Sequence, residues 1–209
     1  MTDAPATAQT APLGQAPRLV GEYVVLRPLT ADDAEITHGW RHSARAGRLN
    51  RAAATVADQA RWIAARPAGE FNYIIEMIGG PPIGMLSLVN IDLSHRRAES
   101  ARFLIGDEAA AKGAPAAVEA MKLLYELAFD RLGLERIYGV IEAGNQRMVK
   151  WQKYLGMVDE GRLRRHLVMD GKFVDLVCLG LQHEEYRAVT VPRINGLMAM
   201  GRPRAGDQA

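Results

Sequence analysis

The stretch from Ala98 to Met157 constrains the fold most, because strand-like and helix-like patterns alternate along it. In chain order these patterns predict a strand, a polar loop, a long helix, a short strand and a second helix, over residues 98–105, 106–113, 114–132, 136–141 and 145–156. Apolar residues spaced three and four apart mark one face of the long helix, which Gly133 ends. Asn145 is suited to cap the second helix and Gly156 to end it.

The loop before the long helix combines small residues with a lysine. The first turn of a helix has backbone N–H groups without partners and a partial positive charge. Gly113, Ala114 and Ala116 would let a phosphate approach that backbone closely, and Lys112 adds a full positive charge. Pro115 suits the first helical turn, where a missing N–H costs nothing. The segment therefore predicts a phosphate-binding turn, with a plain strand-to-helix turn as the alternative.

The rest of the chain supplies further strands and two short helices. Alternating patterns predict strands over residues 23–29, 71–78, 83–91, 162–169 and 173–181, and Asp170-Gly171 predicts a hairpin turn between the last two. Thr30 and Thr55 are suited to cap helices that begin at Ala31 and Val56. This order predicts an α/β fold, in which a largely antiparallel mixed sheet of about seven strands carries helices on both faces.

Length and composition predict one domain with short tails. The chain has 209 residues, of which 48% are hydrophobic, enough for one core. Residues 18–187 form the expected domain. Residues 1–17 lack periodicity and are expected to be a disordered tail. Residues 188–209 are expected to be a C-terminal tail, in which Leu197 to Met200 could dock as a short helix or contact a partner.

Charge and cysteine content narrow the classes of partner. A formal net charge of +2 argues against nucleic acid or an anionic membrane as a partner. The single cysteine, Cys178, excludes a disulfide framework within the chain, which fits a reducing cytoplasm. The sequence contains no apolar run of membrane-spanning length and no N-terminal signal pattern. We therefore expect a cytoplasmic protein without a metal site, with a homodimer as an open alternative.

The phosphate-binding turn, followed by the segment from Asn145 to Met157, resembles the GNAT N-acetyltransferase superfamily and more closely its RimJ/RimL-like branch. The resemblance covers Arg18 to Arg187 and implies a GNAT fold with acetyl-CoA as co-substrate. It implies that the turn binds the pyrophosphate, that the helix from Asn145 flanks the pantetheine arm, and that the preceding strand supplies a backbone N–H to the thioester oxygen. The implied cofactor-binding residues are Phe103, Leu104, Ile105, Lys112, Gly113, Ala114, Ala116, Asn145 and Lys153.

Two positions depart from the pattern of that family. Pro115 occupies the last small position of the loop, which removes one backbone donor. Gln152 stands where many relatives carry a tyrosine proposed to protonate the leaving thiolate. Tyr154 lies about 200° further around the helix and is expected to face elsewhere. The sequence therefore indicates no replacement for that acid.

Acetyl transfer to an amine requires a group that accepts a proton from the amine. Glu99, on the central strand, is the first candidate, and its alternative role is that of an exposed acid or a partner of Arg97. Glu142 is second, with helix-entry support as the alternative. His42 is third, although a lone histidine near a helix end is more often structural.

The run Trp40-Arg41-His42 resembles the Trp-Arg-Asn signature of N-acetyltransferases of the PseH type, which act on nucleotide-linked amino sugars. Arg41 could bind a nucleotide phosphate, and Trp40 could stack on a base or pack in the core. Arg48 belongs to a row of arginines that could line a groove for a diphosphate or form a solvated face.

The predicted function is acetyl transfer from acetyl-CoA to a primary amine of a small substrate, first of all a nucleotide-linked amino sugar such as a UDP-4-amino sugar. Trp40, Arg41, His42 and Arg48 are the expected substrate-binding residues. One alternative is a RimJ/RimL-like protein N-terminal acetyltransferase. The other is a catalytically weak CoA-binding or scaffold module.

Overall fold

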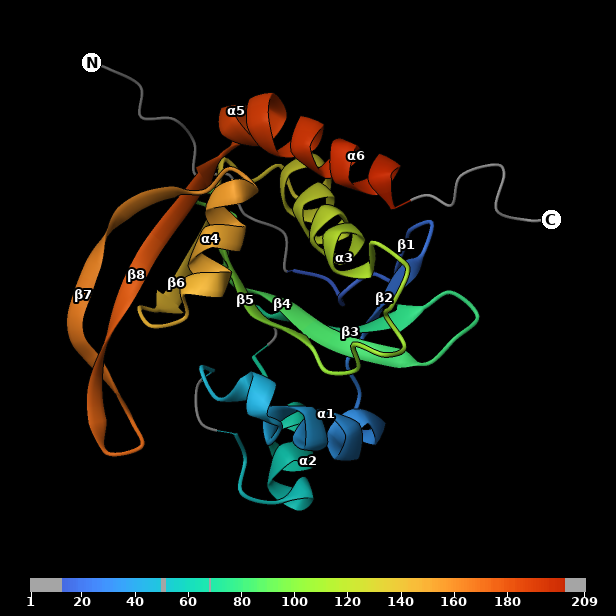
Figure 1. The fold of residues 1–209 in the computed structure, drawn as a ribbon, viewed down its shortest axis with the longest axis vertical. Helices are drawn as coiled ribbons and strands as arrows, with labels where there is room; N and C mark the ends of the chain where they lie inside the picture. Colours follow the sequence, from blue (N-terminus) through green and yellow to red (C-terminus); the bar gives the residue numbers. More distant parts are fainter. Residues whose placement is uncertain (1–12, 50–51, 68, 202–209) are drawn as a thin grey trace, which may run out of the picture.

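Eight strands form one continuous sheet in the computed structural model, which describes residues 13–49, 52–67 and 69–201 (Figure 1). The strand order is β1-β2-β3-β4-β5-β6-β8-β7. The strands are β1 (Leu19–Val20), β2 (Val24–Pro28), β3 (Phe71–Met77), β4 (Pro82–Asp92), β5 (Arg97–Ile105), β6 (Arg136–Glu142), β7 (Val158–Met169) and β8 (Lys172–Gln182). The mixed α/β fold is confirmed, with the two-residue β1 as a strand that the alternation did not indicate.

Helices lie on both faces of the sheet (Figure 1). The α-helices are α1 (Ala34–Arg41), α2 (Val56–Ala64), α3 (Ala116–Tyr125), α4 (Gln146–Tyr154), α5 (His183–Glu185) and α6 (Val191–Met200). Short 3-10 turns over Ala31–Asp33 and Ala44–Ala46 flank α1. Figure 1 shows α1 and α2 beneath the sheet and α3, α5 and α6 above it. The long crossover through α3 allows β5 and β6 to pair in parallel, while every other neighbouring pair is antiparallel.

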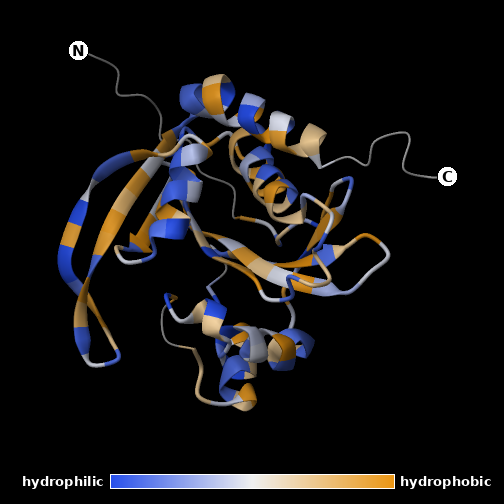
Figure 2. Cartoon of the chain, in the orientation of Figure 1, coloured by the Kyte–Doolittle hydropathy of each residue, from blue (hydrophilic) through white to orange (hydrophobic). Residues whose placement is uncertain are grey.

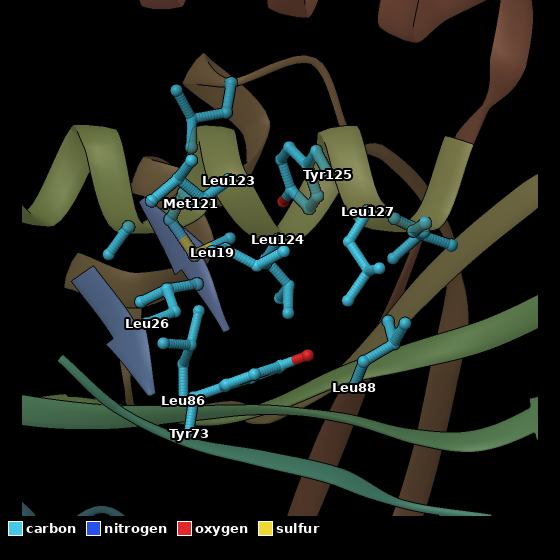
Figure 3. Close-up of a cluster of buried hydrophobic side chains, with 14 of the residues drawn as sticks. Leu19, Leu26, Tyr73, Leu86, Leu88, Met121, Leu123, Leu124, Tyr125 and Leu127 are labelled. Atoms are coloured by element: carbon cyan, nitrogen blue, oxygen red, sulfur yellow. The ribbon is translucent and has the colours of Figure 1, made fainter. Parts of the chain in front are cut away.

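The main core lies between the sheet and α3 (Figure 3). Leu26, Leu86 and Leu88 project from the strands toward Met121 and Leu124 of the helix, and all five are fully buried. This burial of apolar area is the main force that holds α3 on the sheet.

The long helix changes its hydrogen-bonding pattern part-way along. α3 continues without a break into a π-helical segment over Glu126–Arg131, and Gly133 follows with a φ of 63°. The glycine stop is therefore in the expected place. Pro115 differs slightly from expectation, because it caps the helix and Ala116 is the first helical residue.

The C-terminal segment packs more extensively than a tail. α5 leads through a π-helical segment, Tyr186–Thr190, into α6, whose Ile194 and Met198 are buried in the main core. Helical structure thus covers the expected tail from residue 188 to Met200, where the sequence predicted a short docked piece at most. At the other end, Leu13 and Ala16 pack against the same core, although the sequence placed them in a loose tail. The remaining parts of both expected tails, residues 1–12 and 202–209, lie outside the described residues.

β7 and β8 form a long hairpin that extends beyond the rest of the sheet (Figure 1). Its turn has positive φ at both Asp170 (48°) and Gly171 (74°), as the Asp-Gly pair predicts. β7 begins at Val158, earlier than the predicted Arg162. Hydrophilic and hydrophobic residues are interspersed along the hairpin (Figure 2), because both faces of its outer part are exposed.

Candidate active site

The candidate site is a cleft that opens where two central strands separate. β5 and β6 pair in parallel from Arg97↔Arg136 to Glu99↔Tyr138, and no further pair between them is recorded in the described chain. The facing edges of both strands then line a cleft of about 930 Å³. Backbone groups on separated strand edges are free to bind an extended ligand that carries amide groups.

Two β-bulges in neighbouring strands flank the first part of this cleft. Val89 pairs with Glu99 but Asp92 pairs with Arg97, so β4 contains one extra residue there, and Asn90 has a φ of 51°. Further along, Ser87 pairs with Ala101 but Met85 with Leu104, so β5 contains one extra residue at Arg102, whose φ is 58°. Bulges of this kind redirect side chains and are common beside active sites.

Glu99 lies on the cleft wall between the two bulges. Burial raises the pKa of its carboxyl, and the hydrogen bond that Asn90 Nδ2 donates to Glu99 Oε2 (2.9 Å) opposes this rise only in part. A carboxylate with a raised pKa is a better proton acceptor than an ordinary surface glutamate. The position and electrostatics of Glu99 thus fit the role of a general base.

Glu142, the second candidate, also lines the cleft but is already engaged. Its side chain accepts hydrogen bonds from Arg48 (3.2 Å) and from the backbone amide of Gly144 (2.8 Å). Arg48 lines the same wall, so the structure brings these two predicted residues together. The geometry gives Glu142 a role in holding Arg48 and the start of α4.

The three residues of the run Trp40-Arg41-His42 lie in different environments. Arg41 lines the cleft, and burial together with nearby Arg102 lowers its pKa. Trp40 is buried in a cluster beneath the sheet, against Gly106, where a Cβ would collide with its ring. His42 is exposed at the end of α1, where its ring lies 4.0 Å from that of His38. Neither Trp40 nor His42 lines the cleft, so the structure favours packing for Trp40 and gives His42 no contact with the site.

Met148 and Gln152 of α4 line the cleft, together with Asn145 just before the helix. Asn145 Oδ1 accepts a hydrogen bond from Met148 N (3.3 Å), so Asn145 caps the helix as predicted. Gln152 is buried, and its Oε1 accepts a hydrogen bond from the hydroxyl of Tyr125 (2.9 Å). Lys153, predicted to reach the cofactor, forms an ion pair with Asp159 and does not line the cleft. Tyr154 is exposed and also lies outside the lining.

The predicted phosphate-binding turn lies beyond the end of β5. Of the three β5 residues implied to contact the co-substrate, Phe103 lines the cleft, whereas the side chains of Leu104 and Ile105 are buried beside it. Arg45 Nε donates to the Ile105 carbonyl (3.1 Å) and its guanidinium pairs with Glu108, which holds the turn against the segment after α1.

The residues of the turn have the properties expected for anion binding. Lys112 and Gly113 are exposed, and Gly113 has a φ of 87°. Within the described residues, no protein acceptor is recorded for the backbone amides of Gly113, Ala116 and Ala117. Ala114 N makes only a long contact with the Ala111 carbonyl (3.4 Å). These donors and the lysine fit the phosphates of a nucleotide-bearing co-substrate.

A network around Arg102, on the same strand as Glu99, is not indicated by the sequence. Arg102 donates to Glu70 (2.7 Å) and to Asn72 Oδ1 (2.8 Å), and its guanidinium lies 5.2 Å from the centre of the Trp62 ring. Ser87 donates to the same Asn72 oxygen (2.7 Å). Arg102 occurs in an ordinary strand pattern, so its sequence neighbours give no sign of the bulge or of partners about thirty residues away.

The chain belongs to the acetyltransferase (GNAT) domain family, whose model matches residues 24–158. Among solved structures, a GCN5-related N-acetyltransferase from Brucella melitensis superimposes with a TM-score of 0.79 at 23% identity, covering 94% of this chain and 92% of that one. A putative acetyltransferase from T. thermophilus superimposes with a TM-score of 0.71 at 28% identity, covering 86% and 96%.

Curated relatives match over part of their length. A spermidine N(1)-acetyltransferase of Escherichia coli K12 is 28% identical over 119 residues, which are 57% of this chain and 62% of the relative. A putative ribosomal N-acetyltransferase, YdaF, of Bacillus subtilis 168 is 33% identical over 107 residues, which are 51% and 57%. The chain thus spans about three fifths of the length of the curated relatives that it matches.

Neither a membrane-spanning helix nor a metal-binding cluster is found in the described residues. Residues 13–49, 52–67 and 69–201 contain no helix long and apolar enough to cross a membrane. The same part of the chain contains no group of three or more histidine, cysteine or acidic residues arranged to hold a metal ion.

Proposed function

We propose that this protein transfers an acetyl group from acetyl-CoA to a primary amine. The observation that carries the proposal is the position of Glu99, a carboxyl with a raised pKa on the wall of the cleft between β5 and β6. Membership of the GNAT family supports the same reaction. In this reaction the amine nitrogen attacks the thioester carbonyl, the C–S bond breaks, and one proton leaves the nitrogen.

The chain's own residues supply the proton acceptor and the binding groups. Glu99 accepts the amine proton, directly or through one water, and Asn90 holds its carboxylate in place. The free edges of β5 and β6, together with Asn145, would hold the amide-bearing arm of the co-substrate, and Lys112 with the turn amides would hold its phosphates. The co-substrate itself supplies the activated acetyl group.

We propose an amine on a nucleotide-linked sugar as the leading acceptor. Arg41 lies on the cleft wall, where its charge suits a phosphate-bearing substrate, and Arg48 lies on the same wall, where it pairs with Glu142. Two of the three carboxylates in the described lining, Glu70 and Glu142, already pair with arginines. A polyamine would therefore meet one carboxylate, Glu99, that has no recorded arginine ion pair.

Two other acceptors remain as candidates because of the relatives. The spermidine acetyltransferase favours a polyamine, and the putative ribosomal acetyltransferase favours a protein N-terminus. A catalytically weak CoA-binding or scaffold module is the remaining alternative. A homodimer stays a prediction.

The decisive experiment measures thiol release from acetyl-CoA with UDP-4-amino sugars, spermidine and short peptides as separate acceptors. We expect release with a sugar nucleotide, and a KM for that acceptor at least about tenfold higher in Arg41→Ala, because one charge-assisted contact is lost. Arg61→Ala, an exposed arginine of α2 outside the cleft, is the matched control and should behave as the native protein.

The other outcomes distinguish the alternatives. Release with spermidine alone would identify a polyamine acetyltransferase, and release with peptides alone would identify a protein N-terminal acetyltransferase. An absence of release with every acceptor, together with no rise in Tm on addition of acetyl-CoA, would overturn the enzyme assignment.

A further inference from the structure

Gln152 is a buried neutral amide on the wall of the cleft. Its side chain comes from α4, and the residue is 4% exposed, as is Gln59 in the same lining. Among the other amides of the described lining, Gln59 Nε2 donates to Thr37 Oγ1 (3.0 Å) and Asn90 Nδ2 donates to Glu99, while Asn145 Oδ1 accepts from Met148 N.

The buried hydroxyl of Tyr125 fixes the orientation of this amide. Tyr125 is fully buried, burial raises the pKa of its hydroxyl, and Gln152 Oε1 at 2.9 Å is the one partner recorded for it in the described chain. A buried hydroxyl that accepted from Nε2 instead would leave its own proton without an acceptor, which costs free energy. Tyr125 therefore donates, Oε1 accepts, and Nε2 points away from Tyr125.

The N–H groups of Gln152 then have a weak acceptor. The one partner recorded for Nε2 among the described residues is the thioether sulfur of Met148, at 3.9 Å, and Met148 itself lines the cleft. A thioether is a poor acceptor, so a buried donor of this kind is available to a ligand group with more negative charge. The hydrogen bond from Tyr125 and the weak contact with Met148 thus leave the amide donor of Gln152 available at the cleft wall.

We propose that the side-chain amide of Gln152 donates a hydrogen bond to the acyl thioester group bound in the cleft. This inference rests on the proposed acetyl transfer. When the amine attacks, electron density moves onto the carbonyl oxygen and then onto the departing sulfur, while Glu99 takes the proton. A donor fixed in advance stabilises this charge without reorganising. Gln152 acts as a donor and transfers no proton, and Tyr125 acts as a positioning residue.

The first test is kinetic. In Gln152→Leu, which keeps the bulk of the side chain, we expect kcat to fall about 10- to 100-fold, the cost of one or two hydrogen bonds in a transition state. The KM for acetyl-CoA should change by less than about threefold, since the contact strengthens mainly in the transition state. Gln146→Leu, an exposed glutamine on the same helix that donates to the Ala143 carbonyl, is the matched control and should keep the native kcat.

A double-mutant cycle tests the role of Tyr125. Tyr125→Phe alone should lower kcat by about three- to tenfold, because the amide is no longer held in one orientation. In the Gln152→Leu background the same substitution should have no further effect on kcat. Equal effects in both backgrounds would assign Tyr125 a purely structural role and overturn its positioning of Gln152.

A pH profile separates donation from packing. An amide does not titrate, but in Gln152→Glu the side chain donates only when protonated, so kcat should gain an alkaline limb that the native profile lacks.

Inhibition by CoA and by desulfo-CoA, which lacks the sulfur, locates the contact. If Gln152→Leu weakens inhibition by CoA but not by desulfo-CoA, the amide contacts the sulfur. If the inhibition constant of each compound is the same in Gln152→Leu and in the native protein, the amide contacts the carbonyl oxygen.

Failure of the role proposed for Gln152 can be distinguished from failure of the proposed acetyl transfer. If the native protein transfers acetyl groups but Gln152→Leu, folded by its Tm, keeps kcat within twofold, the role of Gln152 is wrong and the proposed function stands. If the native protein releases no thiol with any acceptor, both proposals fall.

Discussion

At the scale of single residues, Glu99 shows how position changes the pKa of a carboxyl. The same glutamate on an open strand would have an ordinary pKa, because water would stabilise its charge. Here the bulges on either side turn it into the cleft, and burial raises its pKa while Asn90 holds one oxygen. Arg102 and Glu70 act on that pKa in opposite directions, so the arginine–glutamate pair adds little net charge.

We predict that Glu99→Gln lowers kcat/KM by about 10²- to 10⁴-fold, the usual contribution of a general base. The native kcat/KM should rise with pH through the raised pKa of Glu99, because the base acts only when it is deprotonated. In Glu99→Gln this limb should disappear and only the titration of the amine should remain. The pH dependence of thiol release measures both. A variant that retains the native acid limb would assign the base to another group.

At the scale of elements, the bulge in β5 joins the sheet to α2 at the cleft wall. A positive φ is unfavourable for arginine, and partners on β3 and α2 hold Arg102 there. Asn72 and Ser87 lie beneath it and are buried, so the network depends on the register of β3, β4 and β5. Such a network keeps the cleft wall rigid, which favours a fixed position for Glu99.

We predict that Arg102→Ala lowers the free energy of unfolding by about 1–3 kcal/mol, because it leaves Glu70 without its charged partner in a half-buried site. Arg97→Ala, which removes an exposed ion pair at the start of the same strand, should cost less than about 1 kcal/mol. Urea titration of both variants measures the difference. Equal costs would show that the network contributes no more than a surface pair.

At the scale of the whole molecule, the C-terminal helix completes the core on the α3 side of the sheet. α6 buries Ile194 and Met198 against elements that precede it by about seventy residues. Its end reaches the start of α3, where a Cβ on Gly201 would lie 2.8 Å from the Pro115 ring. The last helix therefore supports the helix whose first turn is the candidate phosphate site.

We predict that Ile194→Ala lowers the free energy of unfolding by about 2–4 kcal/mol, because it leaves a cavity in the core. Met200→Ala removes a similar volume from the same helix at an exposed position, and should change stability by less than about 0.5 kcal/mol. Chemical denaturation compares the two. A small effect of Ile194→Ala would mean that α6 lies on the core without stabilising it.

Local sequence preferences were enough to predict much of this fold. The Asp-Gly hairpin, the caps at Thr55 and Asn145 and the glycine after the long helix were all predictable, since each depends on backbone preferences of a few adjacent residues. The order of strands and helices followed from periodicity in the same way. Of the site, the position of Glu99 on the central strand was predictable, and so was the motif that implied the family.

Tertiary structure decided which side chains meet in the cleft. The separation of β5 from β6, the bulge at Arg102 and the Tyr125–Gln152 hydrogen bond each join residues that are distant in sequence. Burial of Trp40 and exposure of His42 depend on how α1 lies against the sheet, and a motif of three adjacent residues does not specify this. The sequence by itself therefore determined most of the elements and their order, with β1 and the C-terminal helices α5 and α6 as the exceptions. The register and packing of the sheet determined the site, because contacts across strands depend on the whole pairing pattern.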